Sequence, residues 1–173
     1  IGSLHHIVYD VFKRPEQLTV VFMAVAGCMA TGSFLNSRLV MRFGMRLLSH
    51  VALVTATVLA FVHLGVFRAG GESLPVSILL QAPMMAALGL ANSNFSAMAM
   101  ENMGDVAGTA SSLQGFIATM GAAVMGAVIG QAFDGTTVPL YTGFATLGLI
   151  ALLIIFVTER GKLFRRNRLH SSH

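Results

Sequence analysis

The chain has 173 residues, of which 55% are hydrophobic and only 10% are charged, with a formal net charge of +4. Because soluble domains usually carry about 25% charged residues, this composition argues against an ordinary soluble protein. The basic residues lie beside the ends of apolar stretches and no aromatic residues interleave with them, which argues against a nucleic-acid partner. The single cysteine, Cys28, excludes an internal disulfide.

Five long apolar stretches contain no Asp, Glu, Lys or Arg: residues 18–37, 47–67, 75–100, 106–133 and 138–157. A helix of about 20 apolar residues crosses the hydrocarbon core of a bilayer. The sequence therefore predicts an all-α membrane protein in which residues 18–157 form a bundle of five transmembrane helices. Residues 158–173 read as a basic tail.

The two sides of this bundle differ in charge. Segments 38–46, 101–105 and 158–173 follow the first, third and fifth spans, so they lie on the same side of the membrane. They hold eight of the eleven Lys and Arg residues. Since short Lys- and Arg-rich loops stay in the cytoplasm, we expect the C-terminus to be cytoplasmic. The chain opens at Ile1 without a signal peptide, so we expect a fragment whose residues 1–17 are the end of a preceding span and an outer loop.

Polar side chains cluster in the third span, at Asn92, Asn94 and Ser96, and Gln114 lies in the fourth. An amide in hydrocarbon is costly unless it is paired or faces water. Two interpretations stay open at this point. These side chains either make hydrogen bonds between helices or line a polar substrate pathway.

Small residues recur at helical spacing in two spans. The fourth span has a helix-packing set made of Gly115, Ala122, Gly126 and Gly130, and the first span has a similar stripe made of Ala26, Ala30, Ser33 and Ser37. Small residues at this spacing allow helices to approach closely. Spans 47–67 and 138–157 are rich in large aliphatic residues, which favours a periphery that faces lipid.

Catalytic and metal-binding patterns are not evident. His5 and His6 are adjacent and lack suitably spaced partners, while His50 and His63 are better explained as interfacial or packed residues. No arrangement typical of a hydrolase appears. We therefore expect no enzyme activity, no cofactor and no metal site.

The segment GSFLNSRLVMRFGMRLLS, residues 32–49, follows the first span. It resembles the cytoplasmic signature of the major facilitator superfamily, a helix end that leads into a short basic loop around a central glycine. Arg42, Gly44 and Arg46 match its R-x-G-x-R core, with Arg38 one turn earlier, while Met41 replaces the acidic residue.

Two further segments resemble the Bcr/CflA-type drug-resistance branch of that superfamily. Residues 89–116 are similar to its G-x-x-x-P-N and A-G-x-A-S-x-L-x-G pattern, with Ser93 in place of the proline, and residues 129–140 are similar to its last outer loop. The resemblance implies that the five spans are the eighth to twelfth of twelve, preceded at residues 1–9 by the outer end of the seventh.

The same resemblance implies the C-terminal half of a proton-coupled drug exporter in the bacterial inner membrane, which works by alternating access. Its partners would be the lipid bilayer, the N-terminal half, a small-molecule substrate and protons, and the acidic coupling residue would lie in the missing half. Two alternatives stay open. One is a major facilitator carrier of another class, such as an importer of organic acids or osmolytes, and the other is a truncated fragment that transports nothing.

Overall fold

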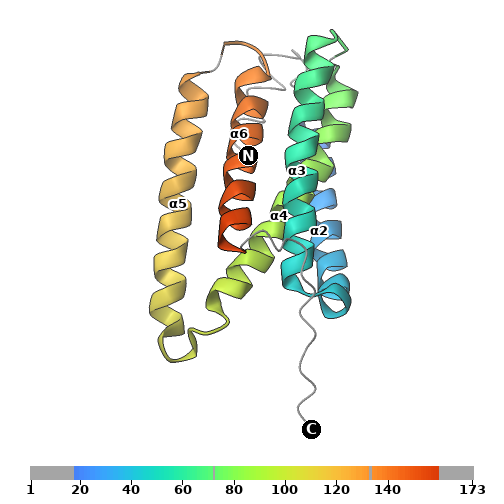
Figure 1. The fold of residues 1–173 in the computed structure, drawn as a ribbon. Helices are drawn as coiled ribbons and strands as arrows, with labels where there is room; N and C mark the ends of the chain where they lie inside the picture. Colours follow the sequence, from blue (N-terminus) through green and yellow to red (C-terminus); the bar gives the residue numbers. More distant parts are fainter. Residues whose placement is uncertain (1–17, 72, 133, 160–173) are drawn as a thin grey trace.

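The computed structural model describes residues 18–71, 73–132 and 134–159, and within these ranges the chain is helical without any strand (Figure 1). The helices are α2 (Leu18–Phe43), α3 (Met45–Arg68), α4 (Leu74–Met100), α5 (Ala107–Gln131) and α6 (Val138–Thr158), with the short 3-10 helix η3 (Gly104–Val106) before α5. In this part of the chain, five helices are long and apolar enough to cross a membrane. The prediction of five helices that are long and apolar enough to span a membrane is confirmed. The expected outer segment 1–17 and nearly all of the basic tail lie outside the described residues.

The first span continues further than its apolar stretch. The expected loop 38–46 is helical except at Gly44, because Arg, Leu and Met are good helix formers and nothing interrupts the helix before Gly44. The prediction of a loop was wrong because hydropathy marks where the bilayer core ends, not where the helix ends. Gly44 has a φ of 83°, a conformation that suits glycine, and joins α2 directly to α3.

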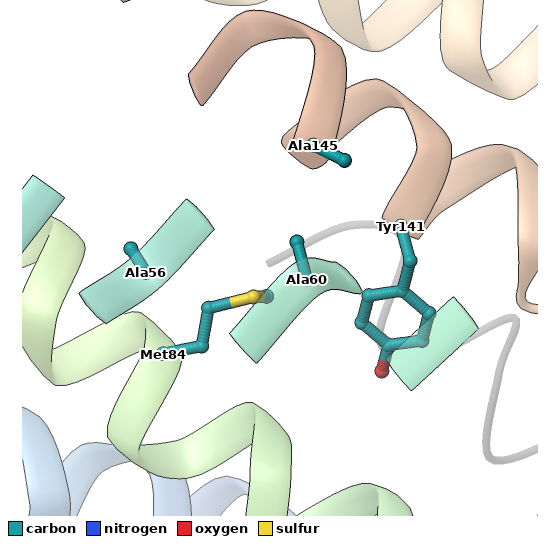
Figure 2. Packing of buried hydrophobic residues seen from close by; sticks show 5 residues of the cluster. All are labelled: Ala56, Ala60, Met84, Tyr141 and Ala145. Carbon is teal, nitrogen blue, oxygen red and sulfur yellow. The ribbon is translucent and has the colours of Figure 1, made fainter. Parts of the chain in front are cut away.

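Helix α3 occupies the centre of the bundle, against α4 on one side and α6 on another. Its buried side carries Ala52, Ala56 and Ala60, four residues apart, which leave room for the neighbouring helices. Figure 2 shows Met84 of α4 and Tyr141 of α6 beside Ala60, with Ala145 of α6 nearby. The aliphatic span 47–67 was expected at the lipid-facing periphery, but only one side of α3, including Val51, Val58 and Phe61, is exposed.

Neighbouring helices pack closely against three glycines. A Cβ added to Gly148 of α6 would collide with Thr57 of α3, and one added to Gly143 of α6 would lie 2.6 Å from Cδ1 of Ile129. A Cβ on Gly32 of α2 would lie 3.2 Å from Cβ of Ala86. These glycines, rather than those singled out by spacing, set the tightest helix contacts within the described residues.

Helix α4 runs unbroken through Pro83 and passes behind α3 toward the foot of α5 (Figure 1). Helix α5 stands at the edge of the bundle, joined to α4 at one end and to α6 at the other. None of its residues is buried. The bundle therefore consists of α2, α3, α4 and α6 packed together and α5 largely uncovered.

Candidate functional site

A reciprocal amide pair joins α2 to α4. The Asn94 side chain donates from Nδ2 to Oδ1 of Asn36 over 2.8 Å, and Asn36 donates back from Nδ2 to Oδ1 of Asn94 over 3.2 Å. Asn94 is only 3% exposed. Each amide thus satisfies one donor and one acceptor of the other, which removes much of the cost of placing them in an apolar bundle.

A second polar contact joins α4 to α5. The Nε2 group of Gln114 donates to the hydroxyl oxygen of Ser96 over 2.8 Å, and both side chains are half-buried. Asn92 lies one turn before Ser96 on α4 and is exposed. Polar side chains of α4 therefore face α2 at Asn94 and α5 at Ser96.

The four predicted pathway residues thus have different environments. Asn94 is buried and paired, Ser96 and Gln114 bond to each other, and Asn92 is exposed. Sequence reasoning missed Asn36. The sequence held one signal for it, which is the predicted depth in the bilayer. Position 36 lies near the end of the first span and position 94 near the end of the third, and these two ends are on the same side of the bilayer.

The predicted small-residue stripes face outward. On α5, a Cβ added to Gly115, Gly126 or Gly130 would meet no atom within 4 Å. On α2, all four residues of the stripe, Ala26, Ala30, Ser33 and Ser37, are exposed. These residues do not pack against another helix within the described residues, so their expected role in helix packing stays a prediction.

The predicted basic loop motif is carried mostly by helix ends. Arg38 and Arg42 lie in the last turns of α2 and are exposed, and the Arg38 guanidinium lies 5.5 Å from the ring centroid of Phe34. Arg46, in the first turn of α3, forms an ion pair over 3.3 Å between Nη1 and Oε2 of Glu159, just after α6. Gly44 supplies the turn, and Arg46 links two helix ends that are far apart in sequence.

Both histidines of α3 are buried, His50 at 2% exposure and His63 at 3%. The predicted packed environment is therefore observed for these two. Among the described residues, no group of three or more His, Cys, Asp or Glu side chains could hold a metal ion.

In comparisons with models of protein families, with curated proteins and with solved structures, nothing matches this chain.

Proposed function

We propose that this chain is the C-terminal half of a proton-coupled exporter of small molecules, of the Bcr/CflA type within the major facilitator superfamily. It works by alternating access in the bacterial inner membrane, with its C-terminus in the cytoplasm. The observation that carries the proposal is the placement of the small-residue faces. They lie exposed on α2 and α5, and these are the two helices that α4 contacts through its polar side chains.

The rest of the surface supports this interpretation. Exposed residues of α6 are large and apolar, including Leu149, Leu153, Ile154, Phe156 and Val157, as suits contact with lipid. The exposed stripes of α2 and α5 instead present glycine, alanine and serine, which suit contact with other helices. The exposed surface of α6 therefore suits lipid, and the stripes of α2 and α5 suit other helices.

In this proposal the second half docks on the small faces of α2 and α5, and the substrate moves between the halves beside α4. Rocking of the halves exposes a midplane site to each side in turn. Asn92 is an exposed polar residue of α4 in this region and would contact substrate. The Asn36–Asn94 pair and the Ser96–Gln114 contact would fix the position of α4 relative to its two flanking helices.

The test uses two separately expressed polypeptides, this chain and the six or seven spans that the proposal requires before it. We expect neither polypeptide alone to extrude a fluorescent lipophilic cation from energised vesicles, and we expect both together to do so. A proton uncoupler should abolish the export. Proton-driven export by the 173 residues alone would refute the proposal, because one half provides only one wall of the pathway.

Orientation has its own test in a variant that lacks Cys28. Cysteines introduced at the exposed positions Ser73 and Asp134, at the ends of α4 and α6 that should face outward, should react with a membrane-impermeant thiol reagent in intact cells. Cysteines at the exposed positions Glu101 and Met103 should react only after permeabilisation. The reverse pattern would refute a cytoplasmic C-terminus.

A further inference from the structure

Cationic and large apolar side chains lie together on the surface of α2 near its C-terminal end. Arg38 and Arg42 are both exposed. The apolar side chains beside them in the last three turns, Phe34, Leu35 and Met41, are 62%, 48% and 78% exposed. This end of the helix therefore presents charge and apolar surface to its surroundings at once.

This surface is distinct from the two other sides of α2. At about 100° per residue, Phe34, Arg38 and Arg42 lie on one side of the helix, centred about 110° from the small-residue stripe. The side that packs against α4 carries Val21 and Val25 and lies about 120° away in the other direction. The two arginines thus lie outside the face on which the second half is proposed to dock.

When α2 crosses a bilayer, these arginines lie at the level of the lipid headgroups. The apolar stretch 18–37 has about the length that the hydrocarbon core requires, and Arg38 is the first charged residue after it. Arg38 and Arg42 are about one helical turn apart, or about 6 Å along the axis. A phosphate group between them can accept hydrogen bonds from both, because each guanidinium offers several N–H donors.

Within the described part of the chain, no carboxylate pairs with Arg38. Helix α2 contains no Asp or Glu, and Glu159 pairs with Arg46. The end of α4, which Glu101 caps, lies toward α5 and away from the end of α2 (Figure 1). The Arg38 guanidinium instead lies 5.5 Å from the ring centroid of Phe34. That ring occupies one face of the guanidinium, so the N–H donors in its plane remain for an anion.

The end of α2 does not itself explain the position of Arg38. Cations are favoured in the last turn of a helix, because the carbonyl groups there carry a partial negative charge. Arg42 lies in that turn, whereas Arg38 lies one turn earlier. Anionic lipids attract basic residues that lie close to the membrane surface. A lipid phosphate supplies the anionic partner that the described residues do not give to Arg38.

We propose that this end of α2 binds an anionic phospholipid. Its phosphate group lies between the guanidinium groups of Arg38 and Arg42, and its acyl chains lie along Phe34 and Leu35. The proposal goes beyond the proposed function and does not rest on it, because it requires neither the second half nor one particular orientation of the chain.

The test is an NMR titration of the whole chain in lipid nanodiscs, with arginine labelled at Nε. Phosphatidylglycerol replaces phosphatidylcholine with the same acyl chains step by step, so that only the headgroup changes. We expect the resonances that disappear in Arg38→Gln and in Arg42→Gln to shift and to saturate as phosphatidylglycerol increases. In Arg42→Gln, the affinity measured at Arg38 should fall about fivefold, which is the usual effect of one basic residue near an anionic surface.

Arg68→Gln is the matched control, because it removes an exposed arginine in the last turn of α3, at the opposite end of that helix from α2. It should leave the affinity measured at Arg38 unchanged. Glycerol phosphate, which carries the phosphate without acyl chains, should leave the Arg38 resonance in place. Circular dichroism of each variant checks that the helices remain folded.

Several results would overturn the lipid site. One is an Arg38 resonance that does not respond to phosphatidylglycerol, and another is a response of Arg68 with the same size and affinity. An Arg38 affinity that is identical in the wild type and Arg42→Gln would also overturn it. A response to glycerol phosphate as strong as that to phosphatidylglycerol would show a site for free anions and not for a lipid.

A final arm separates this site from the proposed function. Adding the second polypeptide should preserve the response of Arg38, because that polypeptide is proposed to dock on the small-residue stripe. Loss of the response in an active two-polypeptide exporter would assign the arginines to the contact between the halves, which overturns the lipid site and leaves the exporter standing. A lipid response in a pair of polypeptides that exports nothing would refute the exporter alone.

Discussion

Replacing both members of the Asn36–Asn94 pair should destabilise the bundle by less than the two single replacements added together. In Asn94→Leu, the Asn36 amide loses both of its bonds to Asn94, which are 2.8 Å and 3.2 Å long. An unpaired buried polar group costs about 1–3 kcal/mol. We expect Asn36→Leu, which orphans the buried Asn94, to lower the free energy of unfolding by an amount in this range, and Asn94→Leu to lower it by less, because Asn36 is half-buried.

The double variant Asn36→Leu/Asn94→Leu leaves no orphaned amide and places two apolar side chains at the α2–α4 contact. Hydrogen bonds between membrane helices average about 0.6 kcal/mol, so the reciprocal pair should give a coupling energy of about 1 kcal/mol. The loss in the double variant should therefore be smaller than the sum of the two single losses by about that amount.

The assay is equilibrium unfolding of the four proteins in mixed micelles, followed by helicity as the denaturing detergent is increased. Asn92→Leu is the matched control, because this exposed asparagine lies two residues before Asn94 on the same helix. It should leave the free energy of unfolding within about 0.5 kcal/mol of the wild type. Additive single losses, or an Asn94→Leu variant as stable as the wild type, would refute the assignment of Asn94 to a structural pair.

Three further predictions concern other contacts. Gly148→Leu should destabilise the isolated chain by at least about 1–3 kcal/mol, because its side chain meets Thr57. Gly126→Leu should not destabilise it, since a Cβ there meets nothing and leucine favours the helix more than glycine does. Equal losses in the unfolding assay would contradict the placement of α5. Glu159→Gln should lower the free energy of unfolding by less than about 1 kcal/mol, and by less still in high salt, because the ion pair with Arg46 is partly exposed. A larger loss of stability that does not depend on salt would argue against that pair. The hydrogen bond from the Thr136 hydroxyl lowers the pKa of Asp134 below its ordinary 3.8, so this bond stabilises the turn above the ordinary pKa and its contribution disappears as the pH falls through the lowered value. In a carboxyl NMR titration Thr136→Val should raise that pKa, and an unchanged midpoint would show that the hydroxyl is not its cause.

The sequence predicted the number and positions of the helices well because bilayer thickness imposes a length that composition reveals directly. Boundaries were less certain. Helix α2 runs to Phe43 although its apolar stretch ends at residue 37, since Arg38 and Arg42 continue a helix as readily as leucine does. Gly44 ends α2, and its positive φ is a backbone property that the motif pattern indicated only as a loop.

Partners of individual residues could not be predicted because spacing reveals the side of a helix but not what lies opposite. The stripe Ala52, Ala56 and Ala60 is buried between α4 and α6, yet large aliphatic neighbours concealed it in the sequence. The partner of Asn94 is Asn36, which is 58 residues away. Only the crossing of α2 and α4 brings these two amides together, and periodicity carries no information on that crossing.

Helix α5 shows what the described chain leaves unexplained. Its large apolar residues Leu113, Phe116, Ile117, Met120 and Val124 lie on a different side of the helix from Gly115, Gly126 and Gly130, at 100° per residue. Each glycine inside a helix costs about 1 kcal/mol relative to alanine. Contacts with another helix backbone could offset that cost, but none lies within 4 Å of these three positions. Glycine on a helix face that contacts lipid gives no packing advantage, whereas glycine on a face that contacts a second bundle lets the helices approach closely. For this reason the proposed second half is assigned to the glycine side of α5.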